Sequence, residues 1–210
     1  SALGQSAPPD ASSDTTVVAL PPVTVEASRA TETAASAPFA VSTVARSRNA
    51  QTLEAPVFLS DALQDLPGVW MNDRGHFALG ERLVVRGMGW RSPFGVRGVQ
   101  VQLDGIPLTM PDGQAFLDIV DPLFVRSAEA VRGPSSLFWG NGSGGVLFLD
   151  TQPRADTPTA TLRAGGGSYG LQQLAAEGVA RTERSTWRAA VSDMRRDGFR
   201  ANSDGRFTRA

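Results

Sequence analysis

Hydrophobic residues recur at helical spacing in one short stretch of the chain. Four apolar residues between Leu59 and Leu66 fall on one helical face, Ser60 is placed to cap the start, and Pro67-Gly68 ends the pattern. The spacing therefore predicts one short amphipathic helix.

The other apolar residues between 51 and 153 form strand-like runs separated by turns. Val99, Val101 and Leu103 alternate with polar neighbours, which predicts a half-buried strand, and Asp104-Gly105 supplies the turn after it. Residues 146–149 are apolar throughout and predict a buried strand. With a further strand at 82–86, these elements predict an α+β domain: a small mixed β-sheet with short helices.

The pattern changes after residue 153. Leu162, Leu174 and Trp187 each lie on an alternating stretch of roughly ten residues with one apolar face, as in a membrane β-barrel. Trp187, beside a polar turn, suits an interfacial aromatic girdle. A soluble β-sandwich alternates in the same way, so this pattern alone leaves both architectures open.

Residues 1–50 are rich in Ala, Ser, Thr and Pro and contain few large apolar side chains. Such a segment buries too little surface to offset the entropy of ordering it, so we expect it to be flexible. Two β-prone stretches interrupt it, at 15–20 and 23–27.

Composition excludes several classes of protein. The formal net charge of −1 argues against a polybasic nucleic-acid binder. The chain has no cysteine and a single histidine, His76, so we predict no metal site and no cofactor. No nucleophile elbow accompanies His76, and we expect no enzymatic activity.

Gly140, Gly142 and Gly145 match the letter pattern of a dinucleotide-binding loop. That loop binds a pyrophosphate only where it follows a strand and opens a helix. Here a short apolar run follows the glycines, so a nucleotide-binding enzyme is the less favoured alternative.

The order of motifs resembles the plug domain of TonB-dependent outer-membrane receptors. Residues 66–69 read Leu-Pro-Gly-Val, residues 132–134 read Arg-Gly-Pro, and Gly144-Gly145 opens the last apolar strand. The chain departs from the family at Ala128 and Ala130, which are smaller than usual, and at Phe148, where asparagine is usual.

The resemblance implies three regions. Residues 1–50 would be a flexible N-terminal segment with a TonB box, 51–153 the plug domain, and 154–210 the start of a 22-stranded transmembrane β-barrel. Three barrel strands cannot close, so we expect the chain to be the N-terminal part of a longer receptor. The resemblance places it in the outer membrane of a Gram-negative-type bacterium, with the plug inside the barrel and a periplasmic N-terminus.

Residues 197–204, which read Asp-Gly-Phe-Arg-Ala-Asn-Ser-Asp, also resemble a recurrent stretch after the third barrel strand of these receptors. The function implied is import of a scarce ligand, most of all a ferric siderophore as this stretch suggests, with the plug occluding the barrel. The expected partners are TonB with its inner-membrane energising complex, a small iron chelate or similar ligand, and outer-membrane lipid, but no nucleic acid. A separately encoded plug-like periplasmic protein is the alternative.

TonB would pair with an extended segment near the N-terminus by strand addition. The favoured segment consists of Val23, Thr24, Val25, Glu26 and Ala27. The alternative segment consists of Asp14, Thr15, Thr16, Val17 and Val18. Pro21-Pro22 before the favoured segment lack the donors that strand pairing uses.

Two arginines match family positions that latch the plug to glutamates of the barrel wall, Arg86 and Arg132. Ligand contacts would come from the loops at 72–80, 87–98 and 107–114. The polar and aromatic candidates there are Arg74, His76, Trp90, Arg91 and Phe94.

Overall fold

The computed structural model describes most of the chain from residue 56 onward and three short strands before it. The described residues are 24–25, 32–33, 40–45, 56–73, 75, 77, 80–93, 95–133, 136–140, 142–153 and 158–210.

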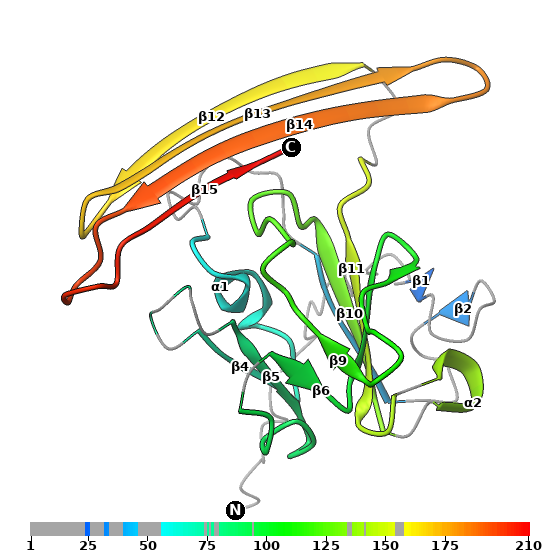
Figure 1. Cartoon of the computed structure of the whole chain (residues 1–210). Helices are drawn as coiled ribbons and strands as arrows, with labels where there is room; N and C mark the ends of the chain where they lie inside the picture. The colour runs from blue at the N-terminus through cyan, green and yellow to red at the C-terminus, as the bar shows by residue number, and fades with distance from the viewer. Residues whose placement is uncertain are drawn as a thin grey trace, which may run out of the picture.

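The chain forms a compact α+β domain on one side and a long curved sheet on the other (Figure 1). In the α+β part and before it, the elements are β1 Thr24–Val25, β2 Glu32–Thr33, β3 Ala40–Ala45, α1 Leu59–Leu63, β4 Val69–Asn72, β5 Arg82–Val85, β6 Val96–Arg97, β7 Gln100–Leu103, β8 Ile106–Pro107, β9 Gln114–Ala115, β10 Ser127–Arg132, α2 Ser136–Trp139 and β11 Gly145–Asp150. The outer sheet consists of β12 Thr159–Gly167, β13 Leu171–Arg181, β14 Thr186–Arg196 and β15 Gly205–Arg209.

The centre of the α+β domain is a five-stranded sheet in the order β3-β10-β11-β7-β8. β11 pairs antiparallel with β10 and parallel with β7, so the sheet is mixed, as predicted. The hairpin β4–β5 and the short pair β6–β9 lie beside it. The larger apolar core includes residues of α1, β5, β7 and β11, with Leu59, Leu63, Leu83 and Leu147 almost completely buried.

Strand β3 extends the sheet beyond the region that the sequence patterns singled out. Its residues pair in register with β10, from Ala40 opposite Arg132 to Ala45 opposite Ser127. The side chain of Val44 packs against the larger core. The division of the chain at residues 51 and 154 stays a prediction, although this strand lies before the first boundary.

Strand β7 is more deeply buried than its alternation predicted. Gln100 and Gln102 are only 6% and 5% exposed, and Val101 between them is completely buried. The prediction of a half-buried strand is therefore wrong, because the face of β7 that carries the two glutamines is covered as well as the face that carries Val101. Alternation reports the polarity of the two faces of a strand and not whether another layer covers the polar one.

Helix α1 is capped by acidic side chains. Asp61 Oδ2 accepts hydrogen bonds from the backbone N–H groups of Val57 and Phe58, at 2.9 and 3.0 Å. Glu81, just before β5, accepts from the N–H groups of Leu59 and Ser60, at 2.7 and 2.8 Å. Ser60 is thus a residue of the helix and not its cap, and the prediction of a Ser60 cap is wrong. The side-chain oxygens of Glu81, from a distant segment, satisfy the free N–H groups instead.

The described elements around the glycine loop do not stand in the order that nucleotide binding requires. α2 precedes the glycines and strand β11 follows them, which reverses the strand–loop–helix order that a pyrophosphate site requires. Gly145 has a φ of +138°, and a Cβ there would overlap the carbonyl oxygen of Val131 on the paired strand. The glycine at this position is therefore explained by the close approach of β10 and β11.

The outer sheet is antiparallel, in the order β12-β13-β14-β15. It crosses one side of the α+β domain, and β12, β13 and β14 extend well past it (Figure 1). The fourth strand, β15, was missed by the sequence patterns, which indicated three strands. Its burial alternates from residue to residue, but it is only five residues long and close to the end of the chain.

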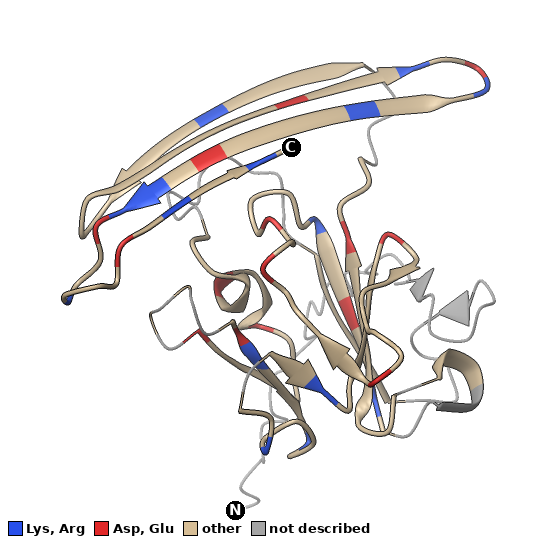
Figure 2. Cartoon of the chain, viewed as in Figure 1, with Lys and Arg blue, Asp and Glu red and all other residues tan. Residues whose placement is uncertain are grey.

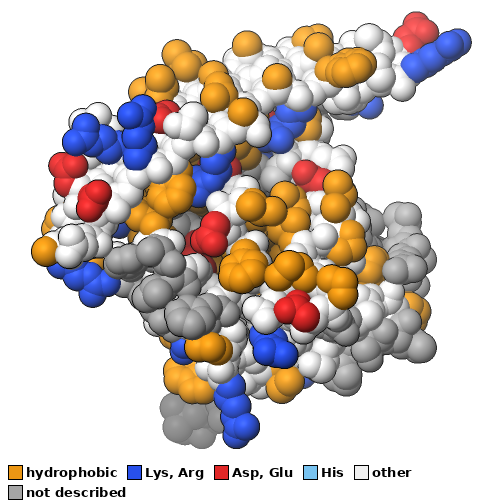
Figure 3. All heavy atoms as spheres, in the orientation of Figure 1, with side chains coloured by type: hydrophobic (Ala, Val, Ile, Leu, Met, Phe, Trp, Pro, Cys, Tyr) orange, Lys and Arg blue, Asp and Glu red, His pale blue; other side chains and the backbone are white. Residues whose placement is uncertain are grey.

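The two faces of the outer sheet differ in character. On β13, Gln173, Ala175, Glu177 and Val179 are buried toward the α+β domain, and the residues between them point away. Leu162, Leu174, Trp187 and Val191 are among the exposed large hydrophobic residues, at 73%, 53%, 69% and 47%. Hydrophobic side chains are spread over the surface of the outer sheet that faces away from the α+β domain (Figure 3). Charged residues gather mostly at the turns and strand ends (Figure 2).

In a water-soluble β-sandwich the apolar face of each sheet packs against the other sheet. The apolar face of this outer sheet is exposed instead, so the sheet is not arranged as half of such a sandwich. Among the described residues, no helix is long and apolar enough to cross a membrane.

Replacing Gly145 by alanine is expected to lower the free energy of unfolding by about 1–3 kcal/mol or more, because the position combines a positive φ with a blocked Cβ. Gly178→Ala on β13 is the matched control, since no atom lies within 4 Å of a Cβ there. Thermal unfolding of the purified protein measures both. Equal stability of the two variants would contradict the steric explanation.

The acid–base behaviour of Glu81 gives a pH prediction. Burial is the main cause that raises its pKa from 4.5 to about 7 in the folded protein. The folded state therefore holds this proton at pH values where the unfolded state has lost it. Stability from this group falls as pH rises from about 4.5 to about 7, by at most about 1.4 kcal/mol per pH unit.

Glu81→Gln is expected to remove that part of the pH dependence while keeping one acceptor for the helix. Denaturant unfolding at a series of pH values measures it. Glu183→Gln, in the exposed turn after β13, should keep the wild-type slope. An unchanged slope in Glu81→Gln would count against the assignment.

Candidate functional site

Part of the favoured N-terminal segment is a strand. Thr24 and Val25 form β1, which pairs antiparallel with β2, Thr24 opposite Thr33 and Val25 opposite Glu32. The other residues of that segment, and all of the alternative segment at 14–18, lie outside the described residues. The choice between the two segments stays a prediction.

Only two of the five ligand candidates can be placed. Arg74, His76 and Phe94 lie outside the described residues. Trp90 and Arg91 are exposed in the loop after β5.

Trp90 belongs to a small aromatic group that the sequence patterns did not reveal. The ring of Trp70, on β4, lies 5.3 Å from the ring of Trp90. The guanidinium of Arg82 lies 5.9 Å from the same ring. Trp70 pairs with Val84 across the β4–β5 hairpin, and Arg82 is two residues before Val84. Trp70 and Arg82 are therefore diagonal neighbours on the same face of the hairpin.

The candidate latch arginines converge on one glycine. The backbone N–H of Arg86 donates to the carbonyl of Gly68 at 3.4 Å. The side chain of Arg132 covers the same residue, since a Cβ at Gly68 would lie 2.9 Å from Arg132 Cδ. Arg132 Nε also donates to the carbonyl of Ala40 at 3.4 Å. Within the described part of the chain, neither arginine forms an ion pair with a carboxylate.

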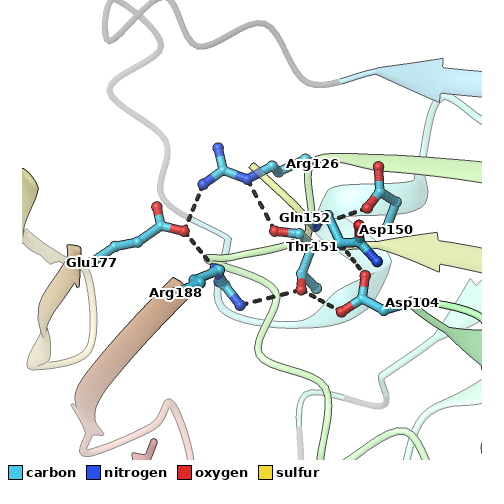
Figure 4. Close-up of polar contacts among 7 residues, drawn as sticks. All are labelled: Asp104, Arg126, Asp150, Thr151, Gln152, Glu177 and Arg188. Carbon is cyan, nitrogen blue, oxygen red and sulfur yellow. Dashed lines mark hydrogen bonds and ion pairs between the residues drawn. The ribbon is translucent and has the colours of Figure 1, made fainter. Parts of the chain in front are cut away.

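A different set of charges joins the α+β domain to the outer sheet (Figure 4). Glu177 Oε1, on β13, accepts from Arg126 Nη2 at 2.6 Å and from Arg188 Nε at 2.7 Å. Arg126 precedes β10 in the α+β domain, whereas Arg188 lies on β14, directly beside Glu177's strand. One carboxylate therefore bridges both parts of the molecule.

The bridge is largely shielded from solvent. The side chain of Glu177 is 4% exposed, that of Arg126 16% and that of Arg188 24%. The guanidinium of Arg188 also lies 5.1 Å from the ring of Phe124. Two cations share one carboxylate here, and hydrogen bonds to charged groups of this kind are stronger than neutral ones.

Thr151 ties the bridge to the end of β11. Its carbonyl accepts from Arg126 Nε at 3.0 Å, and its hydroxyl accepts from Arg188 Nη1 at 3.3 Å. Asp104 holds Thr151 from the other side, because its two carboxylate oxygens accept from the backbone N–H and the hydroxyl of Thr151, both at 2.7 Å.

The sequence patterns used Asp104 only as a turn residue and did not single out Arg126, Thr151 or Arg188. The one available signal was Glu177, a charge on the polar side of the alternation in β13. Its partner Arg126 lies 51 residues away in sequence, so no local pattern connects them.

Weaker contacts surround this bridge. Gln173 Nε2 donates to the carbonyl of Pro56 at 3.0 Å, and Ser192 hydrogen-bonds to Asp121. Arg209, on β15, donates to the carbonyl of Asp118 at 3.2 Å. The α+β domain is thus attached to the inner face of the outer sheet along one side.

Aromatic side chains close one end of this interface. Phe77 stacks on Phe58 with ring centroids 4.7 Å apart and meets Phe207 of β15 at 4.8 Å. Phe199, in the loop between β14 and β15, covers Gly75, where a Cβ would lie 2.8 Å from its ring. Phe77 therefore contacts β15, and Gly75 lies against the stretch at 197–204 that resembles the receptor family.

Among the described residues, no group of three His, Cys, Asp or Glu side chains is placed to hold a metal ion. The interface offers hydrogen bonds, charge pairs and aromatic contacts. These interactions hold two layers together and can be broken and re-formed without covalent chemistry.

Comparison with known proteins agrees with this architecture. A protein 32% identical over 109 residues is described as a hemin receptor of Yersinia pestis, and the match covers 51% of this chain and 15% of that protein. A second, 29% identical over 125 residues, is the ferrichrome outer membrane transporter/phage receptor of Escherichia coli K12, with 58% of this chain and 16% of that protein covered. The chain therefore spans about a sixth of the length of the curated relatives it matches.

A solved structure has the same fold at low sequence identity. The pyoverdine outer membrane receptor of Pseudomonas aeruginosa, 18% identical, superposes with a TM-score of 0.61 over 82% of this chain and 24% of that chain. The family model described as TonB-dependent Receptor Plug Domain matches residues 33–146, more than half of the chain. The chain belongs to the TonB-dependent receptor plug domain family.

Proposed function

We propose that this chain forms the plug and the first barrel strands of an outer-membrane receptor that imports a scarce iron-containing ligand with energy supplied through TonB. The observation that carries the proposal is the seating of the α+β domain on one face of a sheet whose other face exposes Leu162, Leu174 and Trp187. An apolar outward face suits lipid, and a polar inward face suits a domain held inside a barrel.

The ligand proposed is an iron chelate, with a ferric siderophore favoured by the sequence at 197–204. Haemin is the second candidate, because two relatives that match about half of the chain are described as hemin receptors. The exposed Trp90, close to Trp70 and Arg82, offers ring faces and a positive charge. Both ligand classes present flat or anionic groups to such side chains.

TonB is proposed to pair with the segment at 23–27. Support comes from β1, in which Thr24 and Val25 already have the extended backbone that strand addition requires. The alternative at 14–18 remains the competing segment.

Growth tests the function directly. A strain that lacks the full-length gene is expected to lose growth on one chelate among haemin, ferrichrome and other ferric siderophores as sole iron source. The gene should restore growth, except in a strain without TonB. Val25→Pro should abolish the rescue because proline removes a backbone donor, whereas Val17→Pro should not. Rescue in the absence of TonB would contradict the proposal.

The latch arginines give a second test. We propose that Arg86 and Arg132 pair with carboxylates of the barrel wall, as the family resemblance implies, and that both lie at the corner marked by Gly68. Breaking buried ion pairs of this kind costs about 3–5 kcal/mol each when one partner is removed.

The double variant Arg86→Ala, Arg132→Ala of the full-length protein is therefore expected to admit small hydrophilic solutes through the outer membrane. Uptake of a hydrophilic dye by cells measures this leak. Arg91→Ala, an exposed arginine in the same loop region, is the control and should remain tight. Dye uptake equal to wild type in the double variant would remove the latch assignment.

A further inference from the structure

Among the polar contacts that the described residues make across the interface, the ion pair between Arg126 and Glu177 is distinct. It joins two full charges at 2.6 Å, and the Glu177 side chain is 4% exposed. The remaining contacts use a carbonyl, an amide or a hydroxyl on at least one side, as in Gln173 with Pro56 and Arg209 with Asp118. Among the described residues it is the single ion pair that crosses from the α+β domain to the outer sheet.

The pair is placed where it holds two chain segments at once. Arg126 lies directly before β10 and donates its backbone N–H to the carbonyl of Asp150, the last residue of β11, at 2.8 Å. Its Nε binds the carbonyl of Thr151 at 3.0 Å. Arg126 therefore holds the start of β10 and the end of β11 together, at the side of the domain that contacts the outer sheet.

The opposite end of the same strand carries the latch candidate Arg132. Ser127 pairs with Asp150 at one end of the β10–β11 ladder, and Arg132 pairs with Gly145 at the other. The contact at Glu177 is therefore separate from the latch, although the strand between them is shared.

The negative charge of Glu177 balances the positive charges of Arg126 and Arg188. Its Oε1 accepts from both guanidinium groups, and Arg188 Nη2 is buried without a hydrogen-bond partner among the described residues. Without the carboxylate, two shielded cations would face each other across the interface, and like charges in such a setting repel strongly.

We propose that Glu177 is a positioning residue that seats the plug against the β13–β14 hairpin, and that it acts through Arg126. The proposal rests on the proposed function, in which the plug closes the barrel. Arg188 orients the carboxylate from within the sheet, and Asp104 and Thr151 orient Arg126 from within the plug.

The test is passive leak in the full-length protein, in cells without TonB so that no energised transport contributes. The probe is vancomycin, a large hydrophilic antibiotic, and the readout is its inhibitory concentration at matched receptor amounts in the outer membrane. Arg126→Gln and Glu177→Gln are each expected to raise sensitivity several-fold. The double variant should be no more sensitive than either single variant, because both remove the same pair.

Two further variants separate positioning from general stability. Arg126→Lys keeps the positive charge, so its vancomycin sensitivity is expected to be closer to wild type than that of Arg126→Gln. Arg206→Gln removes an exposed arginine that pairs with Asp193 at 3.4 Å on the same sheet, and it should behave as wild type. Arg126 belongs to the plug and not to the wall, so its variants remain informative if Glu177→Gln fails to assemble.

Deleting residues 56–153 separates the closing role of the plug from the role of Glu177. If the deletion leaves the cells resistant, the plug does not close the barrel, and the proposed function fails together with the role of Glu177. If the deletion sensitises the cells but Arg126→Gln and Glu177→Gln stay resistant, only the positioning role is overturned.

Discussion

The pairing of β11 on both edges is the constraint on which the rest of the structure depends. The strand is buried on both faces, runs antiparallel to β10 and parallel to β7, and so cannot shift register without breaking two ladders. Its ends are fixed in consequence. At its start, Gly145 lies so close to Val131 that no side chain fits there. At its end, the carbonyl of Thr151 accepts a hydrogen bond from Arg126.

The second organising feature is the two-sided outer sheet. Because successive side chains of a strand point to opposite faces, the same eleven residues of β13 supply Glu177 to the plug side and Leu174 to the exposed side. The register carries this division across the sheet, since Leu162, Ala176 and Val191 are paired neighbours. A shift of one residue would exchange the apolar face for the charged one.

Much of the fold could be predicted from sequence because its signals are local. The buried run at 146–149, the helix around Leu63 and the alternation near Leu174 each follow from spacing within one element. The long-range polar contacts could not be predicted in this way. Glu81 caps a helix 22 residues earlier, and Glu177 meets Arg126 across 51 residues, so only the tertiary fold brings these partners together.

The small ribbon β1–β2 has a consequence for how a third strand could join it. Among the described residues, Thr24–Val25 pairs along one edge only, with Glu32–Thr33. An incoming chain could therefore dock on that open rim without displacing the existing neighbour. Much of the ordering entropy would already be spent before the encounter, so the grip would come from newly formed backbone hydrogen bonds.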